Sequence, residues 1–303
     1  MEHSLAALSS ELAAAVERAG RSVVAVNGRD HRSSSGIHWA PGVIVTAEHT
    51  LRRDEGITLT LPDGDGVSAA LAGRDAGTDL AVLRAELPKL PVAERSDTGF
   101  KPGSIALAIG RGSETGVVAS MGVVSAVAGA WRTWRGGLVD SYVRLDVTMY
   151  PGVSGGAVAD AGGRLTGLAT GALSRVAGVA IPLATIERVA AELLAKGRVT
   201  RGYLGVGLQP VELPEHLCNR LKLAGAGGLI VLTVEPSAPA GEAGVLIGDI
   251  LVALDGKPVS DTDHVQAALG SEAVGREVKA TLIRGGELAQ LNIAVRERPR
   301  KGD

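Results

Sequence analysis

YPGVSGGAV, at residues 150–158, is the stretch of this sequence that decides the fold. Ser154 stands there among Gly152, Gly155 and Gly156, between apolar segments that read as strands. Glycines let a backbone turn sharply and approach another molecule closely, so the N–H groups of Gly152 and Ser154 can converge on a developing oxyanion. An ordinary Gly-Ser turn explains the same letters, because glycine-rich turns are common. The stretch therefore predicts a nucleophilic serine only if a base and an acid accompany it.

A histidine and an aspartate upstream of Ser154 stand at the ends of two predicted strands. His49 follows an apolar run in GVIVTAEHTL, and Asp79 precedes one in AGTDLAVLR. A serine hydroxyl becomes a good nucleophile when a base takes its proton, and an imidazole base needs a carboxylate to orient it. Taken alone, His49 is consistent with an ordinary surface histidine, and Asp79 is consistent with a turn residue. Together with Ser154 they follow the order His, Asp, Ser of chymotrypsin-type enzymes, which makes the three residues a candidate catalytic triad.

The segments around these three residues resemble the motifs of HtrA proteases. TAEHT at 46–50 is similar to their T-N-x-H-V, TDLAVL at 78–83 matches their aspartate motif, and PGVSGGAV at 151–158 is similar to their P-G-N-S-G-G-P-L. The likeness extends over approximately residues 20–296. Two departures stand beside the triad: Val153 replaces the usual asparagine, and Glu48 replaces a small residue or asparagine before the histidine.

The resemblance implies both a fold and a set of roles. The fold is mainly β: a chymotrypsin-like double six-stranded β-barrel protease domain followed by an α+β PDZ domain. The expected domains are an N-terminal helix at 1–20, the trypsin-like protease domain at 21–197 and the PDZ domain at 198–303. His49 is the implied general base, Asp79 its orienting carboxylate and Ser154 the nucleophile. Gly152 and Ser154 are the implied oxyanion donors.

Composition agrees with a β-rich chain of one large or two medium folded domains. The 303 residues are 45% hydrophobic but only 2% aromatic, so Val, Leu, Ile and Ala must fill the core, and β-branched residues favour strands. Short apolar runs recur between Gly, Asp or Pro, from SVVAV at 22–26 to GVAIP at 178–182. Residues 185–197 then show helical spacing, with Gly197 as the expected C-cap. A new pattern begins after Arg198, with a strand expected at 203–208.

Charge and cysteine content exclude several other classes of function. The net charge is −2, from 31 basic and 33 acidic residues spread along the chain, so we expect no nucleic-acid partner. The single cysteine, Cys218, cannot form an internal disulfide, and it makes no zinc pattern with the six histidines. We expect it to be a buried small residue. We predict neither a metal nor a cofactor.

The N-terminal segment at 1–20 carries Glu2, Glu11 and Glu17 and has no long apolar run. It is typical of an amphipathic helix rather than a signal peptide. Nowhere does the sequence approach the roughly 18 apolar residues of a spanning helix. As written, the sequence therefore predicts a cytoplasmic protein, with a periplasmic or other extracytoplasmic location if a leader was removed.

Specificity is predicted from the position of segments in the expected fold. Residues before the serine and on the following strand should form the walls of the primary pocket. They are small or apolar, and no acidic residue is evident at its base, so we expect cleavage after small aliphatic residues such as Val or Ala. The predicted pocket residues are Thr148, Met149, Leu168, Ala169 and Thr170.

The second domain should bind peptide C-termini. YLGV at 203–206 resembles the carboxylate-binding loop of a PDZ domain, and a bound peptide would add as a strand beside residues 206–209. The predicted binding residues are Tyr203, Leu204, Gly205 and Val206. Asp249, after Gly248 in the long match at 234–259, is expected only to make a turn.

Two functions remain open at this point. The first is a serine endopeptidase of protein quality control that cleaves unfolded or misfolded proteins, with the PDZ domain binding peptide C-termini and regulating activity. The alternative is a chaperone-like binding protein with weak or no proteolysis. An α/β-hydrolase esterase is disfavoured, because its histidine would follow the serine, and none occurs between Ser154 and His216. Resemblance to HtrA proteases also implies a homo-oligomer, commonly a trimer.

Overall fold

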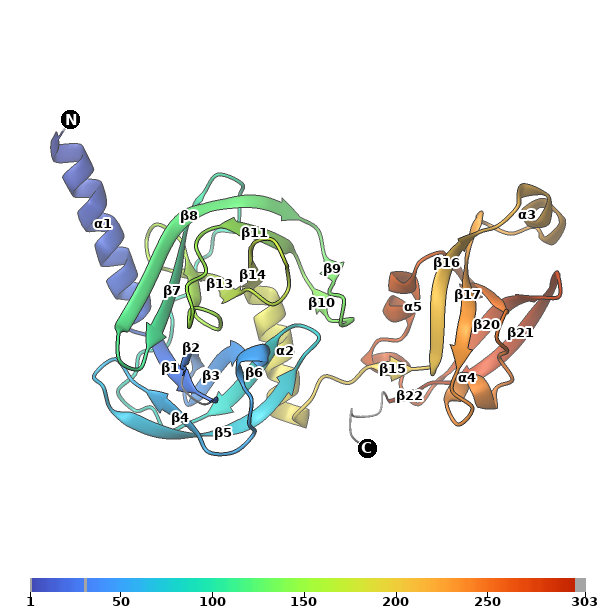
Figure 1. Ribbon diagram of the computed structural model, residues 1–303, viewed down its shortest axis with the longest axis horizontal. Coiled ribbons are helices and arrows are strands. Elements are labelled where there is room, and N and C mark those ends of the chain that lie inside the picture. Colours follow the sequence, from blue (N-terminus) through green and yellow to red (C-terminus); the bar gives the residue numbers. More distant parts are fainter. Residues whose placement is uncertain (1, 30–31, 298–303) are drawn as a thin grey trace. The chain divides into compact units, whose positions relative to one another are not determined.

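The apolar runs of the first 199 residues form two closed β-barrels (Figure 1). The computed structural model describes residues 2–29 and 32–297. The first barrel has the strand order β1-β2-β3-β6-β5-β4. Its strands are β1 (Val23–Asn27), β2 (Ser34–Ala40), β3 (Val43–Ala47), β4 (Ile57–Thr60), β5 (Gly66–Asp75) and β6 (Leu80–Arg84).

The second barrel has the order β11-β14-β13-β12-β7-β8 and the same closed form. Its strands are β7 (Ile105–Gly112), β8 (Gly116–Ala128), β11 (Tyr142–Asp146), β12 (Ala157–Ala159), β13 (Leu165–Thr170) and β14 (Gly178–Pro182). Between β8 and β11 a short hairpin forms from β9 (Trp131–Arg132) and β10 (Leu138–Val139). Because both sheets close, the described strands of the two barrels leave no long unpaired edge.

The alternation of side chains along the strands explains how the two barrels join. In β3, Ile44 packs inside the first barrel, whereas Val43 and Val45 point the other way, into a cluster that contains Leu107 and Ile109 of the second barrel. This cluster between the barrels is the largest apolar core of the unit. Loops at its border carry the candidate triad.

Two helices flank the barrels. α1 (Glu2–Gly20) packs its C-terminal half on the cluster between the barrels through Ala15 and Ala19. α2 (Leu183–Lys196) contacts β5, β6 and β13, and it ends at Gly197, whose φ of 72° closes the helix as predicted. Among the described residues, no helix combines the length and the apolar character that crossing a membrane requires.

The second unit begins at Thr200 and has its own core. Its main sheet has the order β16-β17-β18-β20-β21, with β19 beside β18 and a separate pair of β15 and β22. The strands are β15 (Gly202–Tyr203), β16 (Val206–Glu212), β17 (Gly227–Val234), β18 (Ile250–Leu254), β19 (Lys257–Pro258), β20 (Glu277–Arg284), β21 (Glu287–Ala294) and β22 (Arg296–Glu297). The helices are α3 (Glu215–Leu221), α4 (Pro239–Glu242) and α5 (Thr262–Ala268), and the short 3-10 turn η2 (Ser271–Ala273) follows α5. A second 3-10 turn, η1 (Glu48–Thr50), lies in the first unit.

The predicted mainly-β fold, two six-stranded barrels followed by a PDZ domain, is confirmed. Two details differ. The single strand expected at 203–208 is interrupted, because Leu204 turns its side chain into the core and Gly205 adopts a φ of 76°. Cys218 lies on α3 and is only partly buried, since α3 covers a small satellite cluster rather than the main core.

Candidate active site

Antiparallel pairing of β3 with β6 brings His49 and Asp79 together. Ala47 pairs with Leu80, so the residues just beyond these strand ends become neighbours. His49 Nδ1 lies 2.9 Å from both carboxylate oxygens of Asp79, and the main-chain N–H of His49 donates to Oδ1 at 2.9 Å. The Asp79 side chain is 1% exposed and that of His49 30%. An ionised carboxylate only accepts hydrogen bonds, so it selects the tautomer with the proton on Nδ1 and leaves Nε2 as a base.

The turn before Asp79 is held in an unusual conformation. Asp79 has a φ of 60°, a left-handed value that is uncommon for a non-glycine residue. Asp75 accepts hydrogen bonds from the N–H groups of Gly77 and Thr78 and from the Thr78 hydroxyl. The N–H of Glu48 donates to the main-chain oxygen of Asp79 at 3.0 Å. These contacts stabilise a backbone geometry that aims the carboxylate at the histidine.

Thr170, at the end of β13, contacts the same carboxylate. Its hydroxyl donates to Asp79 Oδ2, and the N–H of Ala172 donates to Thr170 Oγ1 at 3.0 Å. Thr170 is fully buried, and its hydroxyl faces Asp79. No local sequence pattern predicts this contact, because 91 residues separate the two partners.

The turn that carries Ser154 is fixed from the first barrel by Ser35. Ser35 Oγ donates to the main-chain oxygen of Gly152 at 2.7 Å. The N–H of Ser35 donates to the main-chain oxygen of Ser154 at 3.1 Å. Gly155, at a φ of 87°, leaves no room for a side chain: a Cβ there would lie 2.2 Å from Ser35 O. Hydrogen bonds and close packing from the first barrel therefore fix the serine turn of the second barrel.

Within the part of the chain that the structure describes, two amide groups of this turn have no acceptor. The carbonyl of Val153 accepts the N–H of Gly156 at 2.8 Å, and a trans peptide directs the N–H of Ser154 to the opposite side. Within the described residues, neither this N–H nor that of Gly152 donates a hydrogen bond. Ser154 Oγ forms no hydrogen bond to His49 among those residues either. The arrangement provides two unpaired donors beside a serine hydroxyl.

The remaining predicted pocket residues occupy different environments. Thr148 is exposed, Leu168 lies in the core between the barrels, and Ala169 lies in the core of the second barrel. Met149 is partly buried and packs over Gly178, where a Cβ would lie 2.9 Å from Met149 Cγ. Met149 therefore fills space beside β14. Val153, the departure from the HtrA motif, is fully buried in the second barrel, so an apolar residue suits its position.

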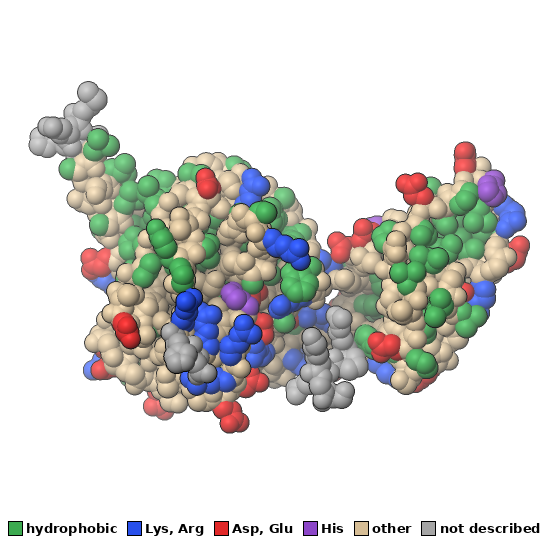
Figure 2. Space-filling view, in the orientation of Figure 1, with side chains coloured by type: hydrophobic (Ala, Val, Ile, Leu, Met, Phe, Trp, Pro, Cys, Tyr) green, Lys and Arg blue, Asp and Glu red, His purple; other side chains and the backbone are tan. Residues whose placement is uncertain are grey.

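Glu48, the other departure, is buried by two arginines. Arg74 donates from Nε and a terminal nitrogen to Glu48 Oε1 at 2.9 and 2.6 Å, and Arg135 lies 3.7 Å from Oε2. Burial acts to lower the pKa of Arg74, but the hydrogen bonds to Glu48 and Asp54 outweigh it and raise that pKa above its ordinary value. Figure 2 shows Lys and Arg side chains gathered around one histidine on this face of the first unit.

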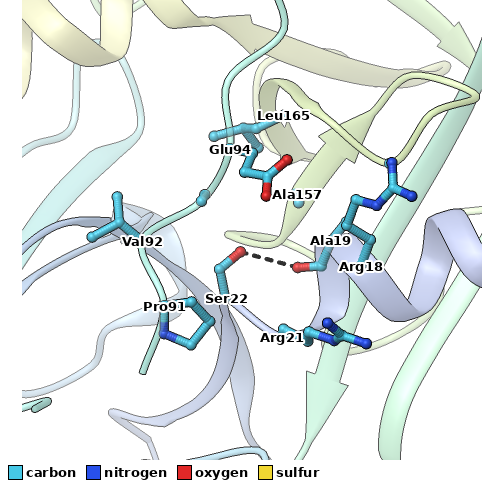
Figure 3. Close-up of a pocket in the computed structure, with 11 residues that line it drawn as sticks. Arg18, Ala19, Arg21, Ser22, Pro91, Val92, Glu94, Ala157 and Leu165 are labelled. Carbon is cyan, nitrogen blue, oxygen red and sulfur yellow. Dashed lines mark hydrogen bonds between the residues drawn. The ribbon is translucent and has the colours of Figure 1, made fainter. Parts of the chain in front are cut away.

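A hollow of about 180 Å³ at the junction of α1 and β1 is separate from the candidate triad (Figure 3). Its lining includes Arg18, Ser22, Pro91 and Glu94, and Ser22 Oγ donates to the carbonyl of Ala19 at 3.0 Å. None of the three triad residues lines it.

In the second unit, the predicted peptide-binding loop lies at an open sheet edge. β16 pairs with β17 on one side and has no partner strand on the other in the described sheet, and α5 contacts β16. The carbonyls of Leu204 and Gly205 accept hydrogen bonds from Ala240 and Glu235. An extended peptide could pair with the free edge of β16.

This fold and this site define a chain with a trypsin-like peptidase domain followed by a PDZ domain. The family model of the trypsin-like peptidase domain matches residues 34–168, and that of the PDZ domain matches residues 202–295. The HtrA-type protease AlgW, solved with a tripeptide, is 30% identical with a TM-score of 0.76, over 95% of this chain and 98% of that one. The chain belongs to the HtrA family of serine proteases.

Other relatives agree with this assignment. The structure of a serine endoprotease from Yersinia pestis is 29% identical with a TM-score of 0.77, over 94% of this chain and 97% of that one. A probable periplasmic serine endoprotease, DegP-like, from Brucella suis is 31% identical over 85% of this chain and 51% of the relative. Periplasmic serine endoprotease DegP of Escherichia coli K12 is 28% identical over 84% and 55%. The chain thus spans about half the length of these curated relatives.

Proposed function

We propose that this chain is a serine endopeptidase that cleaves unfolded or misfolded proteins, using His49 as general base, Asp79 to orient it and Ser154 as nucleophile. The observation that carries the proposal is the buried contact of His49 Nδ1 with Asp79 beside a serine turn with two unpaired amides. Family membership supports the same reaction.

The proposed mechanism follows from these positions. As substrate binds, Ser154 Oγ comes within reach of His49 Nε2, since catalytic hydrogen bonds often tighten only in the complex. The imidazole takes the hydroxyl proton while Oγ attacks the carbonyl carbon, and Asp79 stabilises the imidazolium. The N–H groups of Gly152 and Ser154 bind the resulting oxyanion, each contributing about 2.7–4 kcal/mol. The imidazolium then protonates the leaving amine, and water releases the acyl group by the same steps.

Small aliphatic residues are the proposed preference at the cleaved bond. Met149 over Gly178 limits the space beside the serine turn, and Thr148 contributes no charge. A peptide library cut mainly after Lys or Arg would contradict this assignment.

We also propose that the second unit binds peptide C-termini and thereby regulates the protease domain. The loop Tyr203, Leu204, Gly205 and Val206 would receive the carboxylate on its N–H groups, with the peptide paired to β16. Isothermal titration with a peptide and its C-terminally amidated form tests this: equal affinity for the two would refute carboxylate recognition.

Self-association, expected as a trimer, is supported by exposed apolar side chains. Val117, Met121 and Val123 project from one face of β8, and Leu5 and Leu8 are exposed on α1. Figure 2 shows several patches of hydrophobic side chains on the first unit, separated by other side chains and backbone. A monomer mass by light scattering would contradict the proposal.

Relatives named as periplasmic support the same compartment here, which cell fractionation would test.

Digestion of β-casein separates the enzyme from the alternative, a binding protein that shelters clients. The native protein should degrade casein, and Ser154→Ala should not. If both leave casein equally intact over a range of temperatures, the enzyme proposal fails and the binding function is favoured. Mass spectrometry after fluorophosphonate treatment adds an independent test, because labelling of Ser154 requires an assembled triad and oxyanion site.

A further inference from the structure

The loop at 133–137, between β9 and β10, is attached to the turn that carries Asp79. Thr133 is 3% exposed, and its hydroxyl donates to the carbonyl of Gly77 at 2.6 Å. The same oxygen accepts the N–H groups of Arg135 and Gly137, at 3.3 and 3.2 Å. One side chain therefore organises the loop and joins it to the Asp79 turn.

Close backbone contact reinforces this attachment. A Cβ on Gly137 would lie 2.2 Å from the carbonyl carbon of Gly77 and 2.6 Å from the nitrogen of Thr78. Only glycine lets the loop lie this close to the turn. The turn needs external support, because the left-handed backbone of Asp79 persists only where the surrounding structure over-determines it.

The same loop reaches the histidine turn through Arg135 and Glu48. Arg74 holds Glu48 by two hydrogen bonds and also donates to the carbonyl of Leu51 at 3.0 Å, so it grips the chain on both sides of His49. Arg135 adds its charge to the other oxygen of Glu48, at 3.7 Å, and its guanidinium stacks over the ring of Trp134 at 4.5 Å. Trp134 itself is 75% exposed.

We propose that the loop at 133–137 positions the His49–Asp79 pair, with Thr133 holding the aspartate turn and Arg135, through Glu48, holding the histidine turn. Neither Thr133 nor Arg135 touches the reacting atoms in this role. The inference rests on the proposed protease function, since it concerns the geometry of the same pair. Small displacements at such a pair have large effects on rate, about 10²-fold for 1 Å.

The first test replaces the Thr133 hydroxyl while keeping the shape of the side chain. Thr133→Val should slow fluorophosphonate labelling of Ser154 by about tenfold or more, because the loop loses its bond to Gly77. Thr133→Ser retains the hydroxyl and should label at close to the native rate. The low-field NMR signal of the His49 Nδ1 proton should shift or broaden in Thr133→Val only. Native-like labelling and an unchanged signal in Thr133→Val would overturn the inference.

The second test uses a matched pair of arginines. Arg135 and Arg95 are both 38% exposed in their side chains, both stack on a tryptophan and both pair with a glutamate, but Arg95 contacts Trp39 and Glu187. Arg135→Met should slow labelling severalfold at an unchanged fluorophosphonate affinity, whereas Arg95→Met should not. Equal rates in the two variants at equal melting temperatures would refute the role of Arg135.

These arms also separate the inference from the proposed function. If the native protein is not labelled at Ser154, the protease proposal fails, and the Nδ1 proton signal of native protein and variants still tests the positioning role. If Thr133→Val does not fold, the arginine pair decides the result.

Discussion

Asp79→Asn tests the central contact of the site with a change of one atom. The carboxylate accepts hydrogen bonds from His49 Nδ1, from the His49 main-chain N–H and from the Thr170 hydroxyl, and it is 1% exposed. An amide can accept only on its oxygen, so its NH₂ group must face one of these donors. The imidazole would then adopt the other tautomer, with its proton on Nε2, where it cannot accept the proton of Ser154.

The expected magnitude follows from the bonds that are lost. A hydrogen bond to a charged group contributes about 1.5–3 kcal/mol, and those from His49 Nδ1 and Thr170 together represent about 3–6 kcal/mol of support for the imidazolium. At ~1.4 kcal/mol per factor of ten, kcat should fall by about 10²–10⁴-fold.

The assay is kcat on a fluorogenic peptide, supported by the labelling rate at Ser154. Asp146→Asn provides the control, because it makes the same chemical change at an exposed residue at the end of β11. If Asp79→Asn retains a tenth or more of native activity, roughly the loss of a single weak bond, Asp79 does not orient the base and the mechanism is wrong.

Three further changes test the surroundings of the site and the second unit. Thr170→Val should slow Ser154 labelling by about tenfold and lower the melting temperature, because Asp79 loses a donor; calorimetry and labelling that both match the native protein would contradict this. Met149→Ala should open space over Gly178 and shift a peptide library toward larger aliphatic residues, and an unchanged preference would exclude Met149 from the pocket. Burial acts to raise the pKa of Asp249, but hydrogen bonds from Arg284 and a main-chain N–H outweigh it and lower that pKa. Its stabilising effect is thus present above pH of about 4 and is lost as pH falls through the lowered pKa, so the second unit of Arg284→Met should melt earlier at pH 7, by a margin that shrinks in acid; a pH-independent margin would refute the linkage.

The sequence was most informative where chemistry is local. His49, Asp79 and the glycines around Ser154 lie in short motifs whose order and strand-end positions could be recognised, and the structure places His49 and Asp79 in contact. The strand and helix patterns similarly predicted two barrels and a second unit, because period-two apolar runs reflect burial directly. Gly205 shows the limit: one left-handed residue divided a run that read as a single strand.

Support from distant residues could not be predicted in this way. Ser35 holds Gly152 across 117 residues and Thr170 reaches Asp79 across 91. A serine or threonine in a sequence does not predict such a distant partner, because these residue types commonly hydrogen-bond to their own backbone or to water. Thr170 was accordingly predicted to line a pocket, and only the closed barrels show that its hydroxyl faces the carboxylate.

The end of β5 supports the histidine turn and the aspartate turn together. Arg74 and Asp75 are consecutive, so their side chains leave opposite faces of the strand. Arg74 grips Glu48 and Leu51 around the histidine, while Asp75 accepts the amides of the turn that leads to Asp79. A slip of one residue in the pairing of β5 would exchange these side chains and release both turns at once. Glu48 is therefore the partner that Arg74 requires rather than a defect in the histidine motif. Without the Glu48 carboxylate, the partly buried guanidinium of Arg74 would have fewer hydrogen-bond acceptors beside the histidine turn.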